Sequence, residues 1–185
     1  LNWRLAVPEM ARIVLEGEPA VVLTSADFRA ERDALQSLVD APHWLEFGAA
    51  ADGSYEDLLA GASDAEPEGS ERIGGDDPLL ILYTGGTTGD SKGALHSHRS
   101  IYMGMLNQTV AERIVPSDVY MLTGQMFHIP IGLAMNYMAH GCPLVLVNFE
   151  ARQALELIQE EKVSAFLGVT TMLNWMMAVE NFGSY

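Results

Sequence analysis

The hydrophobic pattern of the first 48 residues predicts alternating helices and strands. Apolar, largely β-branched residues run from 20 to 24 and fit a short strand. Before them, Met10, Ile13 and Val14 recur on one face after Pro8, a residue suited to the first turn of a helix. We therefore predict a helix that begins near Pro8, a strand over 20–24, a helix over 27–39 and a strand over 43–47.

The same alternation continues from residue 79 onward. Leu79 to Tyr83 are continuously apolar, which predicts a strand buried on both faces. Residues 151–162 form an amphipathic pattern, whose inward positions are Ala154, Leu155, Leu157 and Ile158. Further strands are predicted over 92–97, 119–122, 143–147 and 164–167, and further helices over 100–114, 131–139 and 171–179. This order predicts an α/β fold of layered sheets, with mostly parallel strands flanked by helices.

Between these two regions the composition becomes acidic. Residues 49–78 contain nine Asp or Glu residues, five glycines and one cation, Arg72. Residues 55–59 are compatible with one or two turns of helix, and the remainder is typical of a solvated connection. We predict a partial α/β unit over 1–48, an acidic linker over 49–78 and a second α/β unit over 79–185.

The overall composition excludes several classes of protein. Of 185 residues, 49% are hydrophobic, which excludes general disorder. The formal net charge of −15 argues against nucleic-acid binding and against an anionic membrane surface. The single cysteine, Cys142, allows no disulfide within the chain and favours a reducing, cytoplasmic location. Asn136, His140, Gly141 and Pro143 interrupt the apolar stretch 129–147, so we predict a helix and a strand there and no transmembrane segment.

Residues 82–93 are rich in groups that bind phosphate. Glycines allow successive backbone N–H groups to point into one concavity, where they can donate to phosphate oxygens. Threonine hydroxyls add donors, and a lysine adds a compact positive charge. The candidate phosphate-binding residues are Thr84, Gly85, Gly86, Thr87, Thr88, Gly89 and Lys92. The segment is not a Walker A loop, because Ser91 precedes the lysine and Gly93 follows it.

The segment resembles the phosphate-binding motif of the adenylate-forming enzymes, which include acyl-CoA synthetases. The family motif is Tyr-Thr-Ser-Gly-Thr-Thr-Gly-x-Pro-Lys-Gly, and residues 83–93 read Tyr-Thr-Gly-Gly-Thr-Thr-Gly-Asp-Ser-Lys-Gly. Two positions differ: Gly85 stands where the family has Ser, and Ser91 where it has Pro. Neither change by itself removes the backbone donors or the lysine.

Other segments carry the same resemblance along nearly the whole chain. Residues 126–132 are similar to a family segment with the sequence Phe-His, in which the histidine, here His128, faces the acyl and adenylate pocket. Residues 168–173 are similar to the family's Gly-Val-Pro-Thr-x-Leu. Residues 1–5, followed by Glu9, resemble a signature of fatty-acyl and related CoA ligases.

The resemblance implies a part of the large N-terminal domain of an AMP-forming acyl-CoA synthetase. Such an enzyme uses ATP, magnesium and CoA to convert a carboxylic acid, here a fatty acid, into its thioester. The family's catalytic lysine and its magnesium-binding glutamate have no counterpart in this chain, so we assign no catalytic or metal-binding residue. We expect this chain to bind ATP phosphates, to be inactive alone, and to be able to form a homodimer through apolar surface.

Alternative interpretations remain open at this point. Lys92 is also compatible with a solvated surface charge, and His128 with a core histidine that is hydrogen-bonded to backbone. Methionines such as Met103 and Met172 fit core filling better than an acyl tunnel. The main alternative function is a non-catalytic protein that keeps the phosphate loop and binds a nucleotide or a partner.

Overall fold

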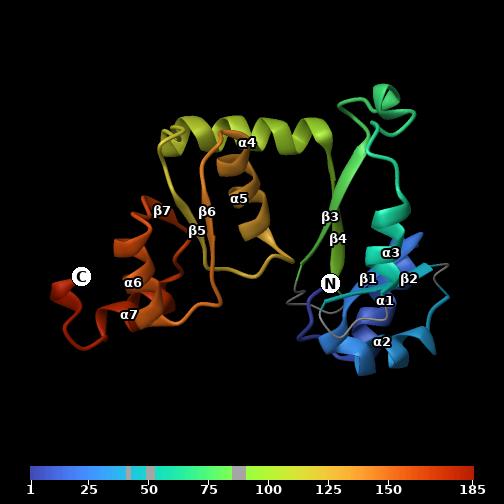
Figure 1. Cartoon of the computed structure of the whole chain (residues 1–185), viewed down its shortest axis with the longest axis horizontal. Coiled ribbons are helices and arrows are strands. Elements are labelled where there is room, and N and C mark those ends of the chain that lie inside the picture. The colour runs from blue at the N-terminus through green and yellow to red at the C-terminus, as the bar shows by residue number, and fades with distance from the viewer. Residues whose placement is uncertain (41–42, 49–52, 85–90) are drawn as a thin grey trace. The chain divides into compact units, whose positions relative to one another are not determined.

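The computed structural model describes residues 1–40, 43–48, 53–84 and 91–185. The chain forms two compact units, residues 1–72 and 73–185. Figure 1 shows the helices and strands of both units. Among the described residues, no helix is both long enough and apolar enough to span a membrane.

The first unit contains two parallel strands and three helices. They are α1 (Val7–Gly17), β1 (Val21–Ser25), α2 (Arg29–Gln36), β2 (His43–Phe47) and α3 (Ser54–Gly61), with short 3₁₀ helices at Ala26–Phe28 and Ser70–Arg72. Pro8 lies in the first turn of α1, as predicted, and Glu9 accepts a hydrogen bond from the Ala6 N–H at 2.8 Å. The core of the unit contains Met10 and Val14 of α1 and Leu35 of α2, which are buried together.

Glu46 of β2 contacts two other elements of the first unit, α2 through its side chain and α3 through its backbone. The side chain of Glu46 in β2 is fully buried and forms ion pairs with Arg29 and Arg32 of α2. Arg32 Nη1 lies 2.7 Å from Glu46 Oε2. The Glu46 N–H donates to Ser54 Oγ at 3.1 Å, which fastens the start of α3 to β2. The sequence predicted a strand over 43–47 but not the burial of its acidic residue.

The second unit contains an antiparallel hairpin and a three-stranded parallel sheet. The hairpin consists of β3 (Pro78–Thr84) and β4 (Lys92–Ser97), and α4 (His98–Glu112) follows it. The sheet has the order β6-β5-β7, formed by Leu144–Leu146, Tyr120–Leu122 and Ala165–Phe166. The remaining helices are α5 (Ile129–Ala139), α6 (Ala151–Glu160), α7 (Thr170–Met177) and a 3₁₀ turn at Phe182–Ser184.

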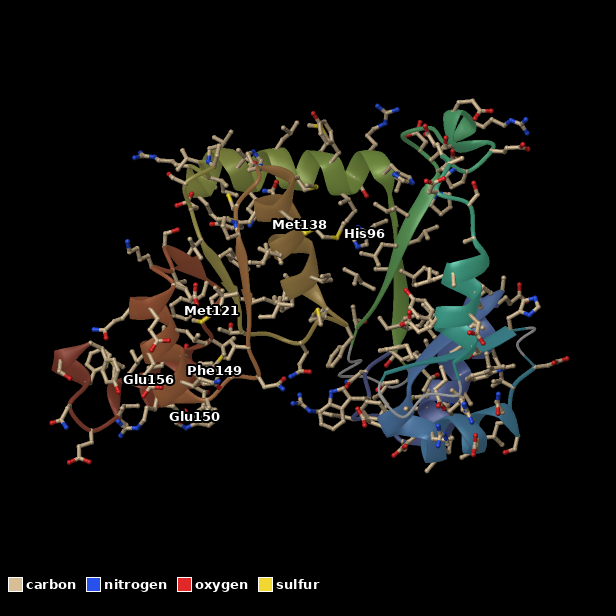
Figure 2. The ribbon with its side chains drawn as sticks, viewed as in Figure 1. His96, Met121, Met138, Phe149, Glu150 and Glu156 are labelled. Carbon is tan, nitrogen blue, oxygen red and sulfur yellow. The ribbon has the colours of Figure 1, made fainter. Side chains whose placement is uncertain are left out.

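Helices cover both faces of the parallel sheet. Alternate residues of a strand point to opposite faces. Tyr120 and Leu122 of β5 are buried together with residues of α5, whereas Met121 between them is buried with Ala154 of α6 and Met176 of α7. Figure 1 shows α5 on one side of the sheet and α6 on the other, and Figure 2 labels Met121 beside α6. The predicted α/β class, with mostly parallel strands flanked by helices, is confirmed.

The predicted burial of residues 79–83 on both faces is wrong. β3 pairs antiparallel with β4, and Leu79 and Ile81 are 44% and 42% exposed. Only residues 85–91 separate the two strands, whereas a parallel crossover needs about a dozen residues or more. An apolar run alone does not distinguish a central parallel strand from a hairpin strand, because both favour the same side chains.

The predicted linker, residues 49–78, contains structured segments. Its helix α3 belongs to the first unit, and the boundary between the two units along the sequence falls between Arg72 and Ile73, inside the predicted linker. At its end, Asp76 forms an ion pair with Arg99 in the first turn of α4, with 2.8 Å between Oδ1 and Nε. The Arg99 guanidinium lowers the pKa of Asp76. The division of the chain at 49–78 stays a prediction.

An amide side chain fastens α5 to α4. Asn136 of α5 is fully buried, and its Nδ2 donates to Met105 O at 2.9 Å and to Gln108 Oε1 at 3.0 Å, both on α4. The next residue of α5 is Tyr137, whose hydroxyl donates at 2.8 Å to Oε2 of Glu112, one turn beyond Gln108 in α4. Asn136, one of the residues that interrupt the apolar stretch 129–147, therefore helps to set how α5 packs against α4.

Candidate functional site

Two of the predicted phosphate-binding residues lie side by side where β3 ends and β4 begins. Thr84 and Lys92 are register partners at the ends of the two strands, and Thr84 Oγ1 donates to Lys92 O at 3.4 Å. Both side chains are exposed. Gly85, Gly86, Thr87, Thr88 and Gly89 lie outside the described residues, so their predicted contacts with phosphate stay predictions.

Close packing explains the glycine that ends the motif. A Cβ added at Gly93 would lie 2.9 Å from Ile81 Cγ2 and 3.1 Å from the Tyr83 ring. Real Cβ atoms essentially never approach another atom below 3.0 Å. Gly93 therefore lets β4 pack closely against the side chains of β3, one residue away from the Thr84–Lys92 pair.

The second candidate region is the carboxyl edge of the parallel sheet. His128 lies at the N-terminus of α5, in the connection that follows β5, and its side chain is exposed. His128 is therefore not buried within the described residues, and its place in an acyl and adenylate pocket stays a prediction. The connection after β7 begins at the same edge, because β5 and β7 run parallel with Met121 opposite Phe166. In open α/β sheets, ligands bind outside the carboxyl ends of strands.

Exposed apolar side chains lie in these two connections and in α7 (Thr170–Met177). Met126 and Ile129, on either side of His128, are 59% and 51% exposed. After β7, Val169 is 56% exposed and Leu173 is 42% exposed.

A cavity of about 440 Å³ borders β7. Its lining residues are Glu112, Tyr120, Leu133, Tyr137, Ser164, Ala165, Phe166 and Leu167. The rings of Tyr120 and Tyr137 stack with centroids 4.4 Å apart. Burial, with the nearby Glu112 carboxylate, raises the pKa of Tyr120 to about 12, and the same causes raise the pKa of Tyr137. Both phenols are therefore neutral at physiological pH. Nothing in the residue pattern indicated this cavity, because a tyrosine on a strand and a tyrosine on a helix are both typical of a core.

The remaining charged groups do not form a metal centre in the described parts of the chain. Across residues 1–40, 43–48, 53–84 and 91–185, no group of three or more His, Cys, Asp or Glu side chains is arranged to hold a metal ion.

The comparison with known families decides what the two regions belong to. The family model described as AMP-binding enzyme matches residues 1–184. The chain belongs to the AMP-binding enzyme family. The match includes the β3–β4 hairpin, the connection that carries His128 and both compact units, so the resemblance seen in residues 83–93 extends to the whole of this AMP-binding chain.

Curated and solved relatives agree with this assignment. The chain is 32% identical over 184 residues to the long-chain-fatty-acid–CoA ligase FadD13 of Mycobacterium tuberculosis, covering 98% of this chain and 36% of that protein. The inhibitor-bound N-terminal domain of FACL13 from Mycobacterium tuberculosis is similar with a TM-score of 0.87 and 30% identity, over 99% of this chain and 46% of that one. ATP-bound MatB from Rhodopseudomonas palustris has a TM-score of 0.82 and 27% identity, over 97% of this chain and 35% of that one. This AMP-binding chain thus spans about a third of the length of the curated relative.

Proposed function

We propose that the protein carrying this chain joins a fatty acid to CoA through an acyl adenylate. The observation that carries the proposal is the Gly/Thr/Lys segment 83–93 inside a chain that matches the AMP-binding family over residues 1–184. The name of the mycobacterial relative supports a fatty acid as substrate, and the ATP-bound MatB structure supports ATP. The predicted homodimer and cytoplasmic location stay predictions.

The reaction has two steps. A carboxylate oxygen attacks the α-phosphorus of ATP, and the bond to pyrophosphate breaks. The thiolate of CoA then attacks the acyl carbonyl carbon, and AMP leaves. The first step builds negative charge on the departing pyrophosphate, so preorganised donors and a cation there lower the barrier. The groups that we assign to this role are Thr84, Gly85, Gly86, Thr87, Thr88, Gly89 and Lys92.

The acid is assigned to the carboxyl edge of the parallel sheet. There His128 is exposed between Met126 and Ile129, which offer apolar surface to an acyl chain. An imidazole at the N-terminus of α5 adds a donor for the carboxylate or the adenylate, and the helix N-terminus favours a negative charge. Magnesium enters with ATP as part of the substrate, and none of the described residues is assigned to hold it.

Pyrophosphate exchange tests the first step directly. The full-length protein is incubated with ATP and labelled pyrophosphate, with palmitate or with acetate as the acid. We expect label to enter ATP only when an acid is present, and faster with palmitate than with acetate. A protein that binds ATP but shows no acid-dependent exchange would be the non-catalytic nucleotide-binding alternative.

A pair of lysine variants tests the role of the loop. Lys92→Ala should slow exchange by about a hundredfold, the typical cost of removing one group that stabilises transition-state charge. Thioester formation from preformed acyl adenylate should change much less. The matched control is Lys162→Ala, which removes an exposed lysine after α6 and should leave both steps unchanged. Equal losses in the two steps for Lys92→Ala would contradict the assignment.

A further inference from the structure

The backbone pairing of β5 with β7 stops short of the carboxyl edge where the acid is assigned. The paired residues are Tyr120 with Ala165 and Met121 with Phe166, and β7 ends at Phe166. Beyond these pairs the two segments leave the ladder and continue into separate connections, one of which begins at Leu167. Leu167 is half-buried, and a backbone carbonyl withdrawn from water needs a hydrogen-bond partner where the ladder ends.

That partner is the side chain of Thr123, the residue that follows β5. Its Oγ1 donates to Leu167 O at 2.6 Å, and Thr123 is only 5% exposed. A β-branched side chain has few allowed rotamers, so this hydrogen bond is a stiff link between the two connections. The link lies one residue beyond Leu122, the last residue of β5.

The next residue is held from the other side. A Cβ added at Gly124 would lie 2.4 Å from Pro130 Cγ, so the chain after Thr123 packs directly against the first turn of α5. On the β7 side, a Cβ at Gly168 would lie 2.9 Å from Phe166 Cε2. Each connection is therefore packed closely against its own segment, and the Thr123 hydroxyl joins the two connections through Leu167 O. His128 lies within the first of them.

We propose that Thr123 is a positioning residue, which sets the opening at the carboxyl ends of β5 and β7 and thereby the affinity for the acid. It acts through the β5–α5 connection, which carries Met126, His128 and Ile129, and not by touching the reacting atoms. This inference rests on the proposed function, because it assumes that the acid binds at this edge. It predicts an effect on the acid that is not shared by ATP.

The test compares hydroxyl-free and hydroxyl-bearing residues at position 123 in the full-length protein. Thr123→Val keeps the shape and removes the donor, and Thr123→Ser keeps the donor. We expect Thr123→Val to raise the KM for palmitate about tenfold, equivalent to about 1.4 kcal/mol, with the KM for ATP within about twofold. Thr123→Ser should recover most of the wild-type KM for palmitate.

A threonine elsewhere in the unit provides the matched control. Thr109 Oγ1 donates to Met105 O at 2.8 Å in α4 and accepts from Asn136 Nδ2 of α5 at 3.2 Å, so it also joins two elements. Thr109→Val therefore removes a comparable hydroxyl and should leave the KM for palmitate unchanged. A merely structural role for Thr123 would give the two Val variants the same kinetic profile, with lower stability and no selective rise in that KM.

The outcomes separate this inference from the proposed function. If the wild-type protein shows no acid-dependent exchange, the proposed function is wrong. If the wild type is active and Thr123→Val binds palmitate with the wild-type KM, the positioning role is wrong. Should Thr123→Val not fold, Thr123→Cys decides with a weaker donor: an intermediate KM for palmitate supports the role, and an unchanged KM overturns it.

Discussion

Replacing the buried Asn136 by aspartate should destabilise the second unit far more than the same replacement at Asn107. Asn136 is 0% exposed, and its Nδ2 lies 2.9 Å from Met105 O and 3.0 Å from Gln108 Oε1. Aspartate places an acceptor oxygen where that donor stands, opposite a backbone carbonyl that cannot turn away. Asn107 lies on the exposed side of α4, where the same added charge is solvated.

The size of the effect follows from the lost donor and the buried charge. An unsatisfied buried polar group costs about 1–3 kcal/mol, and an uncompensated buried charge raises the total to about 3–5 kcal/mol. Burial also raises the folded-state pKa of the new carboxyl above its unfolded value of about 3.9. The loss should therefore be smallest below that pH and grow as pH rises through the folded-state pKa.

Urea unfolding measures both parts of this prediction. The free energy of unfolding is compared for the wild type, Asn136→Asp and Asn107→Asp at pH 5 and pH 8. Asn107→Asp should stay within about 0.5 kcal/mol of the wild type. Similar losses for the two variants, or a loss at Asn136 that does not grow between pH 5 and pH 8, would refute the reasoning.

Three shorter predictions concern other parts of the second unit. Gly124→Ala should lower the free energy of unfolding by about 1–3 kcal/mol, because the new Cβ would lie 2.4 Å from Pro130 Cγ. Gly132→Ala in α5 places its Cβ in open space, so it should be neutral or stabilising by up to about 1 kcal/mol. Equal urea midpoints for the two variants would contradict this prediction. Two backbone N–H groups at the start of α6 lower the pKa of Glu150 from its ordinary 4.5, so its stabilising contribution is present above that pH and disappears as pH falls through the lowered pKa. The Tm difference between the wild type and Glu150→Ala should accordingly shrink in acid, and a constant difference would contradict the capping role. Cys142 is 4% exposed and burial raises the pKa of its thiol, so a disulfide reagent should label it far more slowly in the folded than in the urea-unfolded chain; equal rates would show that the site opens.

The local elements of this protein follow closely from its sequence, because helix and strand periodicity depend on neighbouring residues. The pattern of 151–162 predicted α6, and its predicted inward residues Ala154 and Leu155 are buried. The short run 20–24 predicted β1 within one residue. The Gly/Thr/Lys segment also indicated the family, since its residue types and order are specific by themselves.

Tertiary structure alone decided which elements became neighbours. Ile81 in β3 is 42% exposed, and β3 has an antiparallel partner that the apolar run did not specify. Thr123 and Leu167 are 44 residues apart, and their hydrogen bond exists only because β5 and β7 pair. The same is true of Asn136, which the sequence shows as an interruption of an apolar stretch and the structure shows as the link between α5 and α4. Periodicity records which side of an element is apolar, whereas a polar contact between distant residues depends on the packing of whole elements.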